Sequence, residues 1–285
     1  MRYFSSFTGA GGFDLAVPKD WECAGFSEID KYANMVLKYR FPNVKNYGDV
    51  NAIKWEEIPD FDILFGGTPC QDLSLAGKRK GLAGERSGLF YKFVEALKAK
   101  KPEYFIWENV KGALSSNQGW DFAEVLNQFS EAGYNLWWQV LNAKYFSVPQ
   151  NRERIFIVGF RGRSPPEIFF EPEVSTEDNE ANPIELTNNK SIRDLTTSET
   201  FGTLRSGGSG GVPSQRFVDA DMKIRRLTPR ECERLMSWPD DWTQWGMDEK
   251  GSRTEISDTQ RYRMTGNGVV SNVVKWLIEN VILRD

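Results

Sequence analysis

Histidine is absent from the sequence, which removes the residue that most often acts as a general base in enzymes. Ser-His and Cys-His nucleophile pairs are therefore excluded, and so are histidine ligands for a metal. Cysteine is scarce: Cys23, Cys70 and Cys232 lie far apart, without the spacing of a zinc site or of a disulfide framework. We expect no bound metal, and a nucleophile must be activated by groups other than imidazole.

Long hydrophobic runs are absent as well. No stretch of about 18 apolar residues occurs, so we expect no transmembrane helix. The N-terminal residues MRYFSSFTGAGG lack the charged start, apolar run and cleavage site of a signal peptide, which favours a cytoplasmic protein. The 285 residues suffice for one large domain, with or without a second small one.

An excess of positive charge is the third missing feature. The formal net charge is −4 and the pI about 5.3, which disfavours a nonspecific nucleic-acid coat protein. Local basic runs do occur, and a DNA enzyme needs only such a patch on part of its surface. One of these runs contains Arg225, Arg226, Arg230 and Arg234.

The first 160 or so residues alternate between strand and helix patterns. Helical periodicity is found in Asp30–Tyr39 and Leu89–Ala99. The strand candidates are Arg2–Phe7, Glu22–Glu28, Asp62–Phe65, Tyr104–Trp107, Asn135–Leu141 and Arg154–Phe160. Alternation of this kind predicts an α/β fold with a mostly parallel sheet and helices on both faces. Ligands bind such sheets beyond the carboxyl ends of the strands.

The remainder of the chain suggests a second, smaller domain. We predict a catalytic and cofactor-binding domain over residues 1–161, a loop-rich domain over 162–225 and a return segment over 226–285. Thr228-Pro229 is a helix-start pattern, and Val269–Ile282 predicts a long apolar-striped helix that packs on the first domain.

A glycine-rich turn, Gly9-Ala10-Gly11-Gly12, follows the first strand and precedes an expected helix. Glycine permits both tight turning and close approach of a ligand to the backbone. Glu28 ends the second strand, where a carboxylate can accept hydrogen bonds from ribose hydroxyls. Asp49, placed after a third short strand, can meet an adenine amino group, and Phe7 can stack on the adenine. The set predicts a site for an adenosine-containing cofactor.

Two further groups follow later strands. Cys70, in Pro69-Cys70-Gln71, lies at a strand end next to a basic loop, and nearby cations and backbone N–H groups can make its thiol nucleophilic. Glu108 follows the neighbouring strand, so we expect it near Cys70, where it can protonate or hydrogen-bond a ring nitrogen. Arg152 and Arg154 are expected on one strand face, serving an exocyclic oxygen, a phosphate or Glu108 itself.

Together these motifs closely resemble the DNA (cytosine-5)-methyltransferase family of bacteria and phages. In chain order the matching positions are Phe7–Gly12, Glu28, Asp49, Pro69–Gln71, Glu108–Val110, Gln150–Arg154 and Gly266-Asn267. The resemblance implies a Rossmann-like S-adenosylmethionine-dependent fold with a mixed, mostly parallel sheet and a small target-recognition domain. Two positions depart from the family pattern: Ser5 stands where many members have an acid, and Gly268 where a serine is common.

The resemblance also implies roles for these residues. Cys70 would add to C6 of a flipped cytosine, Glu108 would hold its N3 and amino group, and Arg154 its O2 oxygen with Arg152 nearby. The implied contacts of S-adenosylmethionine are Phe7, Gly9, Gly11, Gly12, Glu28, Ile29, Asp49, Pro69 and Asn267. The candidate DNA contacts are Gln71, Ser74, Lys78, Arg86, Arg193, Thr203, Arg205 and Arg216.

The partner implied is double-stranded DNA, bound by a monomer. A cognate restriction endonuclease would act alongside it without stable contact. Three alternatives remain at this stage: a cytosine-5 methyltransferase of transfer RNA, a noncatalytic DNA-binding protein built on the same fold, and a Rossmann dehydrogenase. A dehydrogenase would not explain the motif at Pro69–Gln71 or the paired arginines Arg152 and Arg154.

Overall fold

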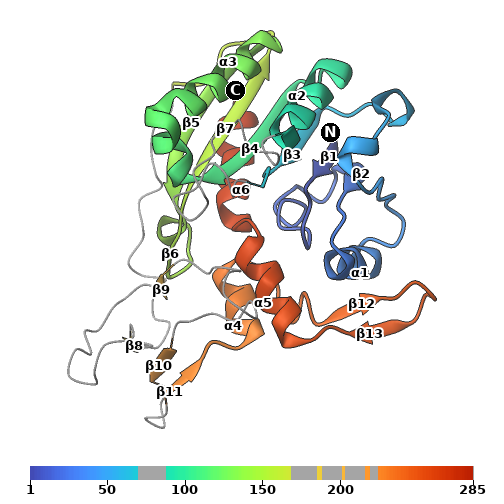
Figure 1. Ribbon diagram of the computed structural model, residues 1–285, viewed down its shortest axis with the longest axis vertical. Helices are drawn as coiled ribbons and strands as arrows, with labels where there is room; N and C mark the ends of the chain where they lie inside the picture. The colour runs from blue at the N-terminus through green and yellow to red at the C-terminus, as the bar shows by residue number, and fades with distance from the viewer. Residues whose placement is uncertain (70–87, 168–184, 188–200, 203–215, 219–223, 285) are drawn as a thin grey trace.

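The computed structural model describes residues 1–69, 88–167, 185–187, 201–202, 216–218 and 224–284 (Figure 1). Its centre is a six-stranded sheet in the order β2-β1-β3-β4-β7-β5. These strands are β1 (Arg2–Ser6), β2 (Glu22–Ser27), β3 (Ile63–Gly66), β4 (Tyr104–Val110), β5 (Tyr134–Asn142) and β7 (Glu153–Arg161). Strands β1 to β4 pair in parallel, whereas β7 is antiparallel to both its neighbours. The predicted α/β fold with a mixed, mostly parallel sheet is confirmed.

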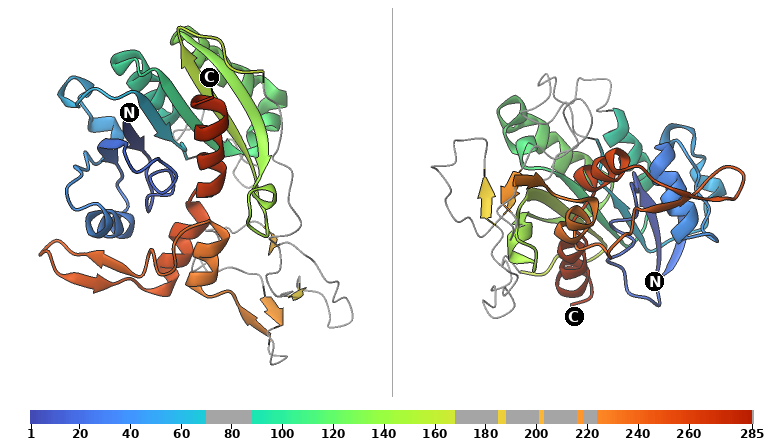
Figure 2. Two further views of the ribbon diagram at one scale, coloured as in Figure 1. Left: turned by 180° about the vertical axis from the view of Figure 1, so that it is seen from behind. Right: turned by 90° about the horizontal axis from the view of Figure 1, so that it is seen from below.

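The sheet buries both faces, because neighbouring residues of each strand point to opposite sides. Ile106 belongs to one apolar cluster, together with α1 (Lys31–Arg40) and the C-terminal α6 (Ser271–Leu277). Phe105 and Trp107 belong to the other cluster, with α2 (Gly88–Lys100) and α3 (Trp120–Glu131). Figure 2 shows the C-terminal helix crossing one side of the sheet, with α2 and α3 on the other.

The return segment runs from α4 (Pro229–Leu235) through the hairpin of β12 (Trp245–Met247) and β13 (Arg253–Glu255) to α5 (Asp258–Asn267). Thr228 begins α4 with a capping box, in which its hydroxyl accepts the Glu231 N–H and Glu231 accepts the Thr228 N–H. The predicted helix start at Thr228-Pro229 is therefore confirmed. The predicted C-terminal helix begins two residues late, at Ser271, and ends as a π-helical turn, Ile278–Ile282.

Short elements complete the described chain. Single 3-10 turns are formed by Val50–Ala52, Trp55–Glu57 and Ala143–Tyr145, and Lys111–Gly119 combines two 3-10 stretches across a kink at residues 116–118. β8 (Glu185–Thr187), β10 (Arg216–Val218) and β11 (Ile224–Arg226) form a small antiparallel sheet, and β6 (Gln150–Asn151) pairs with β9 (Phe201–Gly202). The boundaries of the predicted small domain remain a prediction. In the described part of the chain, no helix combines the length and apolar character needed to cross a membrane.

Three local predictions were wrong. The helix expected after the glycine turn is replaced by successive turns over residues 9–16, and only five residues separate Gly12 from Pro18, a residue that interrupts helices. The strand expected before Asp49 is reduced to one bridge, between Phe26 and Asn46. β4 is longer than expected: pairing with β7 extends it through Val110, so Glu108 lies within the strand.

Candidate active site

The Glu28 carboxylate joins the end of β2 to the glycine turn after β1. Its Oε2 accepts the N–H of Gly9 at 2.7 Å, and its Oε1 accepts the N–H groups of Ile29 and Asp30 at 2.8 and 2.7 Å. Burial raises the pKa of Glu28, and these N–H groups oppose the rise. A carboxylate offers about four acceptor sites, so three backbone bonds leave room for a ligand hydroxyl.

The surroundings of Glu28 fit the adenosine half of a cofactor. A Cβ placed on Gly9 would meet no described atom within 4 Å, so a ligand can approach this backbone. Ile29 is 72% exposed, so its apolar side chain is accessible to a ligand. Phe7 is half-buried with a φ of +54°, and Asp49 is exposed. Two apolar side chains that are not fully buried thus follow β1 and β2, together with the Glu28 carboxylate, and Asp49 begins the 3-10 turn at Val50.

The other two glycines of the turn are packed tightly on their far side. A Cβ on Gly12 would lie 2.9 Å from Cγ1 and 3.0 Å from the carbonyl oxygen of Val269. One on Gly11 would lie 3.2 Å from the Phe41 ring, at a φ of +91°. Gly11 and Gly12 therefore let the turn pack against α1 and the return segment.

Glu108 and Arg154 form an ion pair where β4 and β7 meet. Arg154 Nε lies 3.0 Å from Glu108 Oε1, and both side chains are about 15% exposed. Burial raises the pKa of Glu108 above its usual value, while the charges of Arg154 and Arg152 oppose the rise. Of the partners considered for the two arginines, Glu108 is thus the one that Arg154 contacts.

Arg152 is buried beside this pair but bonds elsewhere. Its guanidinium donates to the carbonyl oxygen of Gly266 at 3.3 and 3.4 Å, and to that of Gly268 at 2.7 Å. The exposed Asn267 lies between these two acceptors. Arg152 therefore anchors the segment that carries Asn267, while its charge still acts on Glu108. Its predicted catalytic role remains a prediction.

The segment before Cys70 leads to the Glu108 side chain. A Cβ on Gly67 would lie 3.0 Å from Glu108 Oε2, and Trp107 Nε1 donates to Thr68 Oγ1 at 3.1 Å. Pro69 is exposed. The predicted adjacency of the strands preceding Cys70 and Glu108 is confirmed, since β3 pairs with β4.

Several predicted site residues lie outside the described residues. They are Cys70, Gln71, Ser74, Lys78, Arg86, Arg193, Thr203 and Arg205. Arg216 lies in β10, where its backbone pairs with Thr187 and Arg226. The predicted DNA contacts therefore remain predictions.

Two of the four arginines in the basic run around α4 are paired with carboxylates. Arg230 Nη2 lies 2.5 Å from Asp241 Oδ2, and Arg234 Nη2 lies 2.6 Å from Asp240 Oδ2. Asp240 and Asp241 lie within twelve residues of these arginines in the sequence. The prediction of a basic patch counted the arginines and left out the nearby aspartates. Arg230 and Arg234 thus contribute less to a DNA-binding patch than their number suggests.

Sequence reasoning also missed residues that support the cofactor end. Trp242 and Ser271 donate to carbonyl oxygens of the glycine turn, and Arg263 pairs with Asp30, next to Ile29. No local sequence pattern predicts these contacts, because the two partners of each contact are more than 200 positions apart in the chain. Asp14 was missed too, although it lies next to the departure noted at Ser5, whose hydroxyl donates to it at 3.3 Å.

The fold and the geometry of the two sites are typical of a class of protein: an α/β enzyme that binds its ligands beyond the carboxyl ends of the strands. Comparison with known proteins specifies the class. Residues 1–210 and 201–283 match the family described as C-5 cytosine-specific DNA methylase. The chain belongs to this family, whose methyl donor is S-adenosylmethionine.

Individual relatives agree with this assignment. The type II methyltransferase M.Bsp6I of Bacillus sp. (strain RFL6) is 32% identical, with 99% of this chain and 98% of that protein covered. The orphan methyltransferase M.SPRI of Bacillus phage SPR is 43% identical, but the match covers only 56% of this chain and 38% of the phage protein. The solved S. pombe Dnmt2 methyltransferase shares the fold, with a TM-score of 0.68 and 19% identity over 98% of this chain and 97% of that one.

Proposed function

We propose that this protein transfers a methyl group from S-adenosylmethionine to C5 of a cytosine in a specific short sequence of double-stranded DNA. The observation that carries the proposal is the buried Glu108–Arg154 pair, which lies against Gly67, three residues before Cys70. A carboxyl group with a raised pKa at this point suits a partner for a ring nitrogen.

The proposed chemistry begins when the target cytosine is flipped out of the duplex. The Cys70 thiolate adds to C6, forming a C–S bond, and the electron pair of the C5–C6 double bond shifts toward N3, where Glu108 supplies a proton or hydrogen bond. Arg154 orients Glu108 and faces O2. S-adenosylmethionine supplies the methyl group to C5.

Release reverses the addition. Loss of the C5 proton to a base restores the double bond as the C–S bond breaks, which frees Cys70 and leaves 5-methylcytosine. Covalent addition divides a difficult substitution on an unreactive carbon into easier steps. Within this proposal, residues 162–225 select the sequence and residues 1–161 carry out the reaction. The protein acts as a monomer, alongside any cognate restriction endonuclease but without stable contact.

The decisive experiment uses unmethylated genomic DNA and S-adenosylmethionine, with 5-methylcytosine mapped at single-base resolution. Methylation confined to one short sequence would support the substrate, the reaction and the specificity together. Methylated transfer RNA with unmethylated DNA would favour an RNA substrate instead.

The covalent step needs its own test, once the target sequence is known. A duplex with 5-fluorocytosine at the target should trap the wild-type protein as a covalent complex on a denaturing gel, whereas Cys70→Ala should trap none and methylate nothing. Cys23→Ser is the matched control, because Cys23 is half-buried and lies away from the Glu108 pair. Methylation by a verified Cys70→Ala preparation would overturn the mechanism.

A further inference from the structure

Trp242, in the loop between α4 and β12, donates its indole N–H to the carbonyl oxygen of Ala10 at 2.7 Å. Ala10 belongs to the glycine turn, 232 positions away in the sequence. Ala10 is 1% exposed and Trp242 9%, so water does not compete freely for this bond. The indole also faces Gly11, since a Cβ on Gly11 would lie 3.7 Å from Trp242 Cζ2.

The glycine turn is bound by side chains from two parts of the chain. From the cofactor direction, Glu28 accepts the Gly9 N–H, as described above. From the return segment, Trp242 binds the Ala10 carbonyl, and Ser271 Oγ donates to the Gly12 carbonyl at 2.7 Å. The peptide group between Ala10 and Gly11 is thus bound at both its ends, because the Gly11 N–H donates to the Thr8 carbonyl at 3.2 Å.

Trp242 is itself fixed by charged neighbours. The Arg40 guanidinium lies 4.6 Å from the centre of the Trp242 ring system and donates to the Trp242 carbonyl at 2.8 Å. On the next residue, the Thr243 N–H donates to the fully buried Glu233 carboxylate at 2.9 Å.

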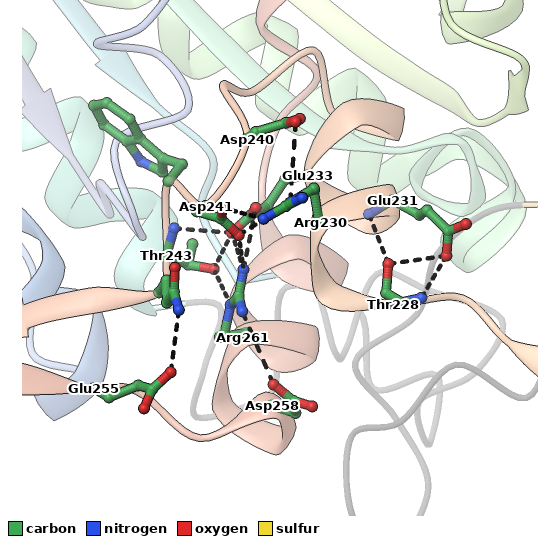
Figure 3. Close-up of polar contacts among 12 residues, drawn as sticks. Thr228, Arg230, Glu231, Glu233, Asp240, Asp241, Thr243, Glu255, Asp258 and Arg261 are labelled. Atoms are coloured by element: carbon green, nitrogen blue, oxygen red, sulfur yellow. Dashed lines mark hydrogen bonds and ion pairs between the residues drawn. The ribbon is translucent and has the colours of Figure 1, made fainter.

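A buried network extends this support to α5. Arg261 Nη2 lies 3.2 Å from Glu233 and 3.3 Å from Asp241, which precedes Trp242 (Figure 3). Buried charges that are paired and hydrogen-bonded hold their geometry, because breaking one pair leaves an uncompensated charge. The loop therefore presents the indole N–H as a fixed donor.

We propose that Trp242 is a positioning residue for cofactor binding, acting through the Ala10 carbonyl. The inference rests on the proposed function only in taking the glycine turn as the cofactor turn. Gly9 and Gly11, on either side of Ala10, both occupy the left-handed region, and glycine there leaves a peptide free to rotate. Holding the Ala10 carbonyl keeps the Gly9 N–H on Glu28 before the cofactor arrives, which reduces the ordering cost of binding.

Trp242→Phe tests the proposal, because it removes the indole N–H and keeps an aromatic ring in the packing. We expect the Kd of S-adenosylhomocysteine, measured by calorimetry without DNA, to rise about fivefold to tenfold, the effect of one buried hydrogen bond. The KM for S-adenosylmethionine should rise by a similar factor, while kcat at saturating cofactor stays within about twofold.

Trp137→Phe is the matched control, since Trp137 is 2% exposed in β5, at the opposite edge of the sheet from β2. It should lower the melting temperature and leave the Kd unchanged. If Trp242→Phe does not fold, a benzothienylalanine at position 242 deletes only the N–H from the same ring shape. Its Kd should rise by the same factor.

Equal Kd values for wild type and a folded position-242 variant would overturn the inference, and so would equal increases at positions 242 and 137. A different result would contradict the proposed function. A wild-type protein that binds S-adenosylhomocysteine but methylates no nucleic acid contradicts the proposed function and leaves the Trp242 comparison intact. A wild-type protein that does not bind this ligand contradicts both.

Discussion

The proposed cofactor site and the proposed target-base site each contain a partly buried glutamate, and different groups stabilise the two carboxylates. Glu28 accepts three neutral backbone N–H groups, whereas Glu108 pairs with the Arg154 guanidinium and feels the charge of Arg152. Backbone donors fix the shape of the chain around Glu28. Arginines set the charge around Glu108, whose proton matters for the proposed chemistry. Glu28 thus stabilises the local backbone, whereas Glu108 is placed for the proposed chemistry.

A third carboxylate, Asp14, is buried, and the groups that stabilise its charge are its own backbone N–H and the hydroxyls of Tyr3 and Ser5, with no arginine among them. Its Oδ2 accepts one hydrogen bond from Ser5, the Tyr3 hydroxyl is also close, and Cys23 is its other titratable neighbour. Burial raises the pKa of Asp14 to about 7. The hydrogen bonds to Asp14 oppose this rise in its pKa but do not cancel it.

The largest effect is expected from Glu108→Gln, which keeps the side-chain volume and removes the acidic proton. Methyl transfer at saturating cofactor and DNA should fall by roughly 10²–10⁴-fold, the usual contribution of a general acid. The Kd of S-adenosylhomocysteine should not change. Glu153→Gln is the control, because Glu153 is a partly exposed β7 glutamate paired with Lys111. A Glu108→Gln protein with altered cofactor binding and a normal kcat would contradict the different roles assigned to Glu28 and Glu108.

Asp14→Asn should change the pH dependence of stability. The folded-state pKa of about 7 lies above the ordinary 3.8, so the carboxyl contributes stability below about pH 4 that is lost as the pH rises to about 7. At pH 8 the variant should therefore be more stable than wild type, by at most about 4 kcal/mol, and the advantage should vanish near pH 4. Urea unfolding at several pH values measures this. Parallel stability curves would show that Asp14 does not titrate in this range.

Glu28→Gln should give the smallest of the three effects. Its amide nitrogen cannot accept a backbone N–H, so at least one bond to the glycine turn or to Ile29 and Asp30 is lost. The Kd of S-adenosylhomocysteine should rise about tenfold, with kcat at saturation within about twofold. Glu22→Gln serves as control, since Glu22 is an exposed glutamate at the start of the same strand. A large loss of kcat with an unchanged Kd would assign Glu28 to the chemistry instead.

Several expectations held because they depend on local patterns. Apolar runs bounded by glycine or polar residues located β3 and β4, and helical periodicity located α1 and α2 to within one residue at their starts. The helix expected after Gly12 is absent, and the short segment between Gly12 and Pro18 leaves room for little more than one helical turn. The length of β4 was underestimated because its last residues are paired with β7, which follows more than 40 residues later.

The sequence by itself determined the order of the motifs, the candidate reactive residues and the strands to which Glu28 and Glu108 belong or next to which they lie, because local composition and spacing carry this information. Tertiary structure decided the partners. Strand register brought Arg154 to Glu108, and the return of the chain carried Trp242 to the Ala10 carbonyl. Such pairings depend on how distant segments pack on a common core, because a side chain selects among partners only after the backbone has brought them within reach.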